Sequence, residues 1–497
     1  MTRDLQLDAP LTWREIAAIA HGGRLTLSDA ARERIVDARA IVDSLVERGI
    51  RGYGINTGVG ALCDVVIDRP QQRALSHNIL MSHACGVGAP LGREEVRAIL
   101  AAQVNLYARG ASGLRLELVE ALGALLAHDC LPVVPSRGSV GYLTHSAAIG
   151  LVLVGAGAAT YRGQRISGAQ ALAAVGLKPF QLGAKEGLSL VNGTPCSTGL
   201  GCLAAARLSA LADWADAAAA MSYENLGSQA NVFASLPLGL RRSPGVQQVG
   251  ASMRHYLDGS VLLARSVGTR TQDPLSLRAV PQIHGAVRDA LAQVGEVLNR
   301  ELASVSDNPA VAGTPEAPEV YSQAHAVAAS IGLAMDSLGV AAAELAAIAE
   351  RRLDRLVNPL VSGLPAFLAA DGGVCSGYMI AQYTAASLVA ENRRLAAPAS
   401  LDGGITSALQ EDILVHATPA SLKALAILDN LETILAIELL AATQAYELQP
   451  AAAAPAPALA AIQARIRAEV PPYADDRPMM DDIAAVVRQI RRGPPAG

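Results

Sequence analysis

The sequence predicts an all-α protein built around a bundle of long helices. Its composition is 51% hydrophobic with only 3% aromatic residues, and Ala and Leu dominate. Both residues lose little conformational entropy when they enter a helix. Apolar residues also recur at three- and four-residue steps over unusually long stretches, which is the helical period. These stretches cover about residues 281–305, 322–356, 376–396 and 419–447.

The first part of the chain alternates shorter helical patterns with polar loops. Thr12 and Ser28 are N-cap signals for two helices. Residues 52–60 contain so many glycines that we expect a loop there, which places Tyr53 beside backbone that a ligand can approach closely. Further helical patterns cover residues 71–84 and 93–130.

A second loop, residues 134–145, leads into an apolar run that ends near Ala159, and its prolines and glycines indicate a tight turn. A third loop, residues 186–195, precedes a long helical pattern that ends near Ser222. The stretch 223–280 is irregular.

We therefore expect three consecutive parts. Residues 1–195 form an N-terminal part that carries the loops, and residues 196–450 form the long-helix bundle. Residues 451–497 form a linker and a short C-terminal helix, because an Ala/Pro tract such as 450–460 is typical of a linker.

Composition excludes several classes of function. The net charge is −5 with both signs interspersed, and without a basic stripe we expect no nucleic-acid partner. The longest apolar run is too short to span a bilayer, so we expect no membrane partner. The six cysteines lack metal-ligand spacing and are typical of reduced thiols in a cytoplasmic protein. We expect no metal and no cofactor.

Several ordered sequence blocks point to a family. They are Tyr53-Gly-Ile-Asn-Thr-Gly58, Leu80-Met-Ser-His-Ala-Cys-Gly-Val-Gly88, Lys185-Glu-Gly-Leu-Ser-Leu-Val-Asn-Gly-Thr194, Val305-Ser-Asp-Asn-Pro309, Gly372-Gly-Val-Cys-Ser-Gly-Tyr-Met-Ile-Ala-Gln382 and Gln410-Glu-Asp412. Over about residues 10–447 the chain resembles the histidine and aromatic amino acid ammonia-lyases. The resemblance implies an ammonia-lyase-like helix bundle that forms a homotetramer, with each active site built from more than one subunit.

The chain departs from this family at the chemistry. In the family the loop continues from Gly-Ser-Val-Gly into Ala-Ser-Gly, which cyclises into an electrophilic methylidene-imidazolone. Here Gly141 is followed directly by Tyr142. Leu275, Ala324 and Leu409 also replace a Tyr, a Phe and an Asn of the family pattern. Departures this concentrated indicate that one function was replaced by another.

The resemblance implies roles for the residues that match. Tyr53 is the general base that removes the β-proton, which requires its pKa to lie below the usual value of about 10. Arg278 binds the substrate carboxylate in a two-pronged hydrogen bond, and Asn192 assists at the carboxylate or the base. Glu411 lies near the substrate ring or its cationic nitrogen, and His83 contacts an imidazole ring.

Two further residues stand where the electrophile is missing. Tyr142 and His145 are expected to bind the substrate there, because an aromatic face attracts a trimethylammonium group by about 0.5–2 kcal/mol.

These residues lead to a prediction of function. A quaternary ammonium has no lone pair to bond an electrophile, and it leaves as a neutral amine without one. The sequence therefore predicts 1,2-elimination of trimethylamine from an amino acid betaine. Because His83 favours an imidazole, we expect ergothioneine or a related imidazole betaine, converted to thiourocanate by acid–base catalysis in an ergothionase-like branch of the family.

Two alternatives remain open at the level of sequence. The chain is an ordinary histidine ammonia-lyase whose Ala-Ser-Gly triad is missing from the recorded sequence, or it is a non-catalytic homologue that binds a ligand. Retention of Tyr53, Asn192, Arg278 and Glu411 argues against the second alternative, because an inactive site need not keep an acid, a base and a carboxylate ligand together.

Overall fold

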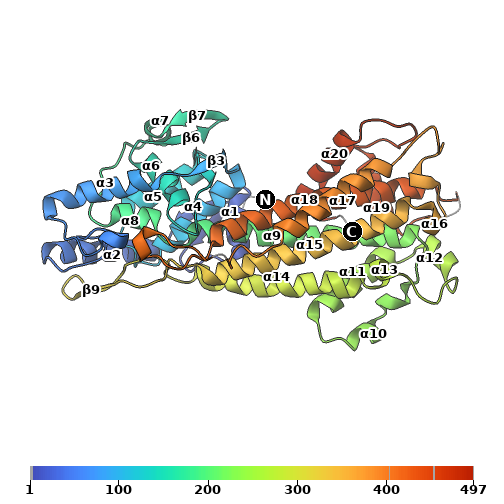
Figure 1. Ribbon diagram of the computed structural model, residues 1–497, viewed down its shortest axis with the longest axis horizontal. Helices are drawn as coiled ribbons and strands as arrows, with labels where there is room; N and C mark the ends of the chain where they lie inside the picture. Colours follow the sequence, from blue (N-terminus) through green and yellow to red (C-terminus); the bar gives the residue numbers. More distant parts are fainter. Residues whose placement is uncertain (1–3, 402, 451–453, 496–497) are drawn as a thin grey trace. The chain divides into compact units, whose positions relative to one another are not determined.

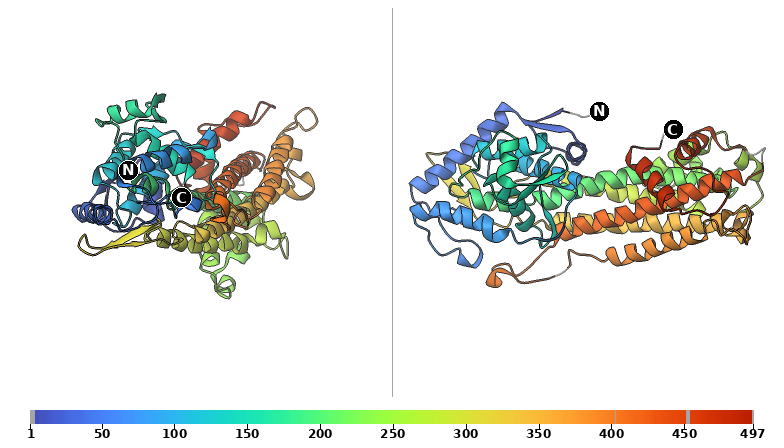
Figure 2. Two further views of the ribbon diagram at one scale, coloured as in Figure 1. Left: turned by 60° about the vertical axis from the view of Figure 1, so that its left-hand side comes forward. Right: turned by 90° about the horizontal axis from the view of Figure 1, so that it is seen from above.

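The computed structural model describes residues 4–401, 403–450 and 454–495, and helices dominate it in every view (Figure 1 and Figure 2). The chain divides into two compact units, each assembled from separate segments. The first unit contains Met1–Ala206, Val294–Asp336 and Pro398–Leu422, and the second contains Arg207–Gln293, Ser337–Ala397 and Lys423–Gly497. The all-α prediction is confirmed.

The longest described helices are those that the apolar periodicity predicts. They are α9 (Pro195–Asn225), α14 (Val280–Leu302), α15 (Ala329–Val357) and α18 (Ala417–Glu447), and the shorter α17 (Met379–Leu395) is also at its predicted place. Four of the five unit boundaries fall inside the four longest helices, and the fifth, at Ala397 and Pro398, follows α17. The units therefore do not follow the three consecutive parts expected from the sequence, and that division stays a prediction.

The first unit contains many of the shorter helices and all the described strands. Its remaining elements are β1 (Asp4–Leu7), α1 (Trp13–Ala20), β2 (Arg24–Leu27), α2 (Asp29–Glu47), α3 (Gln72–His83), β3 (Val87–Pro90), α4 (Arg93–Tyr107), α5 (Leu116–Ala127), β4 (Leu131–Pro132), β5 (Pro135–Arg137), α6 (Thr144–Leu153), β6 (Ala158–Tyr161), β7 (Gln164–Ser167), α7 (Gly168–Ala174), α8 (Glu186–Val191), β8 (Ala310–Gly313) and β9 (Pro318–Tyr321). β1 and β2 are parallel, whereas the pairs β3–β5, β4–β6, β6–β7 and β8–β9 are antiparallel.

The second unit contains the other short helices. These are α10 (Ser235–Gly239), α11 (Pro244–Leu257), α12 (Val261–Ser266), α13 (Leu275–Arg278), α16 (Pro359–Ser362), α19 (Pro457–Arg467) and α20 (Met480–Arg491). The predicted Ala/Pro linker differs from the structure, because α19 begins inside that tract with Pro457 in its first turn, where proline is favoured. Residues 451–453 of the tract lie outside the described residues.

Helix ends follow their sequence signals. The Thr12 side chain accepts a hydrogen bond from Glu15 N, and the Glu15 carboxylate accepts one from Thr12 N at 2.8 Å, which completes a capping box. Ser28 Oγ accepts from Ala31 N at 3.1 Å at the start of α2. Among the described helices, α15 is long and apolar enough to cross a membrane, but 61% of its apolar window is buried.

Three helices of the first unit pack against one another and determine where the loops lie. α3, α6 and α8 are in mutual contact. The closest approach is at Gly187 of α8, where an added Cβ would lie only 2.0 Å from the Ser76 carbonyl oxygen of α3. Glycine is required here because any side chain would push the two helices apart.

We expect Gly187→Ala to lower the free energy of unfolding by roughly 1–3 kcal/mol, the usual cost of overpacking a tight contact. Urea denaturation measures this change. Gly123→Ala in α5 is the matched control, because nothing lies within 4 Å of a Cβ at that position. An equal loss of stability in both variants would contradict the proposed close contact.

Candidate active site

A cavity with a volume of ≈ 930 Å³ lies within the first unit. Most of the residues singled out from the sequence line this cavity, namely Tyr53, His83, Tyr142, Asn192 and Glu411. They come from five separate places in the chain. The fold therefore brings together side chains that share no local sequence pattern.

The packing of α3, α6 and α8 explains this convergence. His83 is the last residue of α3, Tyr142 lies just before α6, and Asn192 directly follows α8. Because the three helices contact one another, these three ends lie close together. Tyr53 belongs to the glycine-rich loop, and Glu411 belongs to the loop before α18.

Tyr53 is half-buried, and its hydroxyl oxygen accepts a hydrogen bond from Gly60 N at 2.8 Å. Burial raises the pKa of Tyr53, the Gly60 hydrogen bond lowers it, and the neighbouring Glu411 charge raises it further. The net pKa is raised. The expectation of a lowered pKa is therefore wrong for the single chain, because no cation of the described cavity lining offsets the burial.

The Glu411 charge acts on both phenols of the cavity, Tyr53 and Tyr142. Thr406 Oγ1 donates a hydrogen bond to Glu411 Oε2 at 3.0 Å. Burial raises the pKa of Tyr142 most, and the charge and hydrogen bond of Glu411 raise it further. The Tyr142 hydroxyl is therefore protonated and is oriented toward the Glu411 carboxylate.

The backbone around Tyr142 is held by four hydrogen bonds. Ser139 Oγ accepts from Gly141 N at 3.1 Å and donates to the Tyr142 carbonyl oxygen at 2.9 Å. Thr418 Oγ1 donates to the Gly141 carbonyl oxygen at 3.0 Å. Leu143 N donates to the Val191 carbonyl oxygen at 3.0 Å. The Tyr142 side chain is thus presented from a well-anchored turn.

His83 contributes a neutral imidazole to the cavity. Its Nδ1 lies 3.1 Å from Ser82 Oγ. Burial lowers the pKa of His83 below its usual value, although the Ile79 carbonyl and the Glu411 charge oppose this. At neutral pH the ring is therefore uncharged and can both donate and accept a hydrogen bond.

Asn192 is supported by a buried ion pair. Asn192 Nδ2 donates to the Asn308 carbonyl oxygen at 2.5 Å. The preceding residue, Asp307, pairs with Lys185 at 3.0 Å, and both of these side chains are fully buried. Lys185 Nζ also donates to Ser189 Oγ at 2.8 Å. Sequence reasoning gave Lys185 no functional part, yet it anchors the segment that positions Asn192.

Two of the expected site residues do not line the cavity. His145 is the second residue of α6 and is 1% exposed, and burial lowers the pKa of its ring. Its side chain is buried in the packing of the first unit and is not among the residues that line the cavity. Arg278 ends α13 in the second unit, where its Nη1 donates to the Asp273 carbonyl oxygen at 2.8 Å.

The side chains that line the cavity give it a negative charge. Glu411 and Asp412 line it, and no Lys or Arg is among the described residues that do so. Sequence reasoning missed several polar lining residues, namely Cys63, Asn308, Gln323, Ser407 and Gln410. Asn308 and Gln410 belong to two of the ordered sequence blocks, and that membership was the available signal for them.

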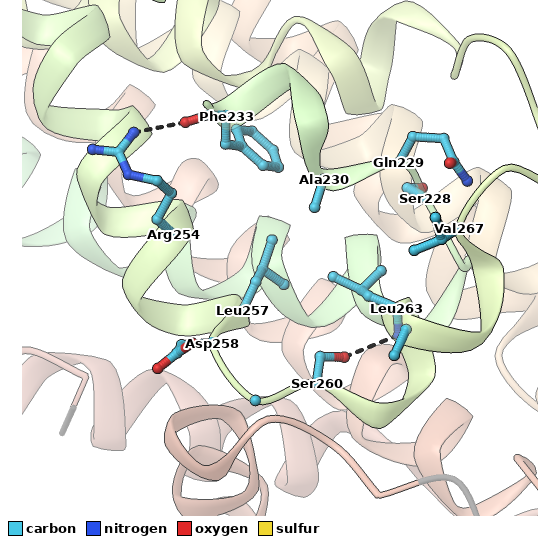
Figure 3. Close-up of a pocket in the computed structure, with 12 residues that line it drawn as sticks. Ser228, Gln229, Ala230, Phe233, Arg254, Leu257, Asp258, Ser260, Leu263 and Val267 are labelled. Atoms are coloured by element: carbon cyan, nitrogen blue, oxygen red, sulfur yellow. Dashed lines mark hydrogen bonds between the residues drawn. The ribbon is translucent and has the colours of Figure 1, made fainter. Parts of the chain in front are cut away.

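A second, smaller pocket lies in the second unit and has a volume of ≈ 450 Å³. Figure 3 shows that its lining is mainly apolar, with Leu257, Leu263 and Val267 facing it. Arg254 Nη1 donates a hydrogen bond to the Phe233 carbonyl oxygen at 2.6 Å. The guanidinium group of this pocket is therefore already engaged with the backbone. None of the residues expected to carry chemistry lies there.

The loop that carries Glu411 has an unusual backbone. Ser407, Ala408 and Leu409 all have positive φ, at 52°, 50° and 77°. Side chains in this left-handed region cost about 1–2 kcal/mol per residue. Ser407 Oγ accepts a hydrogen bond from Ala61 N at 3.2 Å, which joins this loop to the glycine-rich loop of Tyr53.

We expect Leu409→Gly to raise the free energy of unfolding by up to about 1 kcal/mol, because glycine adopts this φ without strain. Leu409 is 70% exposed, so little packing is lost. Chemical denaturation measures the change. Leu401→Gly is the control, since this residue is 74% exposed and is absent from the described positive-φ positions. A gain in the control as large as in Leu409→Gly would contradict the argument.

A sequence model of a known family matches this chain over residues 11–468, and the family is described as aromatic amino acid lyase. The chain belongs to the aromatic amino acid lyase family. This lyase is therefore a member of a carbon–nitrogen lyase family, as its ordered sequence blocks indicate.

Individual relatives of the lyase are similar over nearly their whole length. A histidine ammonia-lyase from Symbiobacterium thermophilum is 45% identical over 493 residues, covering 98% of this chain and 97% of the relative. The structure of histidine ammonia-lyase from Trypanosoma cruzi matches with a TM-score of 0.90 at 34% identity, covering 98% and 93% of the two chains. The ergothionase from Treponema denticola matches with a TM-score of 0.91 at 27% identity, covering 98% and 99%.

These relatives correct the predicted function. The lyase is 45% identical to a histidine ammonia-lyase but only 27% identical to an ergothionase. The prediction of trimethylamine elimination from ergothioneine is therefore wrong, and the betaine substrate loses its support. The missing triad shows which group the cavity lacks, but it does not specify the substrate.

The family resemblance implies a methylidene-imidazolone, and the residues of the lyase do not fit this group. Its formation needs an Ala-Ser-Gly triad, whereas the chain runs from Gly141 directly to Tyr142. The Ser139 side chain bonds to both Gly141 N and the Tyr142 carbonyl, which closes the turn over these two residues. No step of the chemistry is assigned to such a group.

Proposed function

We propose that this lyase removes ammonia from histidine by 1,2-elimination and so forms imidazolylacrylate. The observation that carries the proposal is the joint presence of Tyr53, His83, Asn192 and Glu411 around one cavity. The 45% identity to a histidine ammonia-lyase supports the same reaction. The cavity volume of ≈ 930 Å³ is ample for a substrate of this size.

The proposed roles follow from the chemistry of each side chain. Tyr53 takes the β-proton, and the electron pair of that C–H bond forms the new double bond. His83 binds the imidazole ring of the substrate through a neutral ring nitrogen. Glu411 faces the positive α-ammonium group, and Asn192 binds at the carboxylate.

Substrate binding also changes the environment of Tyr53. In the free cavity, burial raises the pKa of Tyr53 most, and the Glu411 charge raises it further. A bound α-ammonium neutralises that charge at close range, so it lowers the pKa of Tyr53 toward the range of a general base. The substrate therefore helps to activate its own base.

The substrate carboxylate needs a cation that the described cavity lining does not contain. We assign this role to Arg278 of a second copy of the chain, in a homotetramer. Exposed apolar side chains of the second unit support assembly. At least four-fifths of the surface is exposed in Leu236, Leu240, Leu360 and Val374, at 83%, 80%, 90% and 82%. We place the enzyme in the cytoplasm.

The test is an assay of the purified protein with L-histidine. We expect the conjugated imidazolylacrylate, followed by its ultraviolet absorbance, and an equal amount of ammonia. Sedimentation of the same sample tests the tetramer. If L-histidine binds without release of ammonia, the chain is a non-catalytic binding homologue and the proposed function fails.

A further inference from the structure

The turn at Gly141 and Tyr142 places a phenol at the point where the family sequence continues into its electrophile. Tyr142 lines the cavity, and its backbone is fixed by the Ser139 and Thr418 side chains. A side chain presented from such an anchored turn is pre-organised for contact with a ligand. The phenol is half-buried, so it faces the cavity rather than bulk solvent.

Charge identifies the ligand group that suits this phenol. Glu411 and Asp412 line the cavity, and its described lining contains no Lys or Arg. The Tyr142 hydroxyl and the Glu411 carboxylate act on each other directly. A phenol beside a carboxylate, with no cation nearby, fits a positively charged group that donates hydrogen bonds. An α-ammonium group meets this description, whereas a carboxylate would be repelled.

We propose that Tyr142 and Glu411 together form the α-ammonium site of this lyase, with Tyr142 in the place of the missing electrophile. The proposal rests on the proposed function and adds the group that meets the leaving nitrogen. Glu411 keeps that nitrogen protonated, and the Tyr142 hydroxyl oxygen accepts a hydrogen bond from it. Tyr142 is thus a catalytic residue in contact with the substrate.

The step balances without an electrophile. The ionised Tyr53 oxygen takes the β-proton, and the C–H electron pair becomes the carbon–carbon π bond. The C–N bond breaks, and its electron pair leaves with the nitrogen. Because the nitrogen already carries three protons, it departs as neutral ammonia. The positive charge of the substrate and the negative charge of Tyr53 disappear together.

A pair of ligands tests this site independently of turnover. L-histidine and imidazolylpropionate share the ring and the carboxylate, but only L-histidine has the α-ammonium. Calorimetry with the full-length protein is expected to show that Tyr142→Phe weakens L-histidine binding by about tenfold, the usual effect of one hydrogen bond to a charged group, and leaves imidazolylpropionate binding unchanged. Glu411→Gln is expected to show the same selectivity, and Tyr161→Phe in β6 is the control.

The outcomes distinguish failure of the ammonium site from failure of the proposed reaction. Equal losses for both ligands, or no loss for L-histidine, would overturn the ammonium site while the proposed reaction stands. Ammonium-dependent binding with no imidazolylacrylate formed by the unaltered protein would overturn the proposed function alone. If the unaltered protein does not bind L-histidine, both fail. Thermal unfolding of each variant shows whether it is folded.

Insertion of Ala-Ser-Gly between Gly141 and Tyr142 gives a second, independent test. The insertion displaces Tyr142 from its anchored turn, so we expect turnover of L-histidine to fall by at least tenfold. A rise in turnover, together with the mass loss of a cyclised triad, would show that the cavity is still arranged for the electrophile and would overturn the inference.

Discussion

Replacement of Tyr53 by Phe is expected to reduce kcat for L-histidine by about 10²–10⁴-fold, the range for loss of a general base. The ring of Phe fills the same space, so the Michaelis constant is expected to change little. The Gly60 N–H loses its 2.8 Å acceptor, which costs roughly 1 kcal/mol of stability at most. Steady-state kinetics and thermal unfolding measure the two effects separately.

The pH dependence of the unaltered enzyme follows from the same residue. The pKa of Tyr53 is raised, and only the ionised phenol is a base, so kcat/KM is expected to increase with pH on the alkaline side. The pKa of His83 is lowered, so its ring stays neutral down to pH values below about 6.5. An unchanged kcat in Tyr53→Phe would contradict the role of Tyr53, and Tyr161→Phe is the control in which kcat is expected to stay the same.

The largest effect on stability is expected for Lys185→Met. This change leaves the fully buried Asp307 carboxylate without its ion-pair partner at 3.0 Å. An uncompensated buried charge costs about 3–5 kcal/mol. Chemical denaturation measures the loss. Activity is also expected to fall, because Asp307 precedes Asn308, whose carbonyl oxygen binds Asn192.

An exposed ion pair provides the matched control. Arg51 and Asp64 lie 3.0 Å apart with side chains that are 56% and 95% exposed. Arg51→Met is expected to cost less than about 1 kcal/mol, because water screens and replaces such a pair. In the double variant Lys185→Met/Asp307→Asn part of the lost stability is expected to return. A loss in Lys185→Met no larger than in Arg51→Met would contradict the assignment of a buried pair.

The sequence predicts much of the cavity because its residues belong to short motifs at loops. Tyr53, His83, Asn192 and Glu411 each stand in a block with turn-forming neighbours, and such loops lie at helix ends. The direction of a side chain on a helix is harder to predict. His145 follows Tyr142 closely in sequence, yet its place in α6 directs it into the packing.

Other features of the fold and the site depend on the three-dimensional arrangement and cannot be predicted from local sequence. The pattern that begins at residue 322 has the helical period, but α15 starts at Ala329 because Ser322, Gln323 and Ala324 line the cavity instead. The pKa of Tyr53 depends on its burial beside Glu411, which no local motif encodes. The predicted substrate was wrong because the absence of one group leaves many possible ligands.

Three hydrogen bonds connect Tyr53 to Glu411 through adjacent backbone positions. They join Tyr53 to Gly60, Ala61 to Ser407, and Thr406 to Glu411. The spacing between phenol oxygen and carboxylate is therefore a property of the polypeptide, set before any substrate enters. This fixed spacing selects ligands by the separation of their acidic hydrogen and their positive nitrogen, so amines in which one more carbon lies between these two groups are expected to bind poorly.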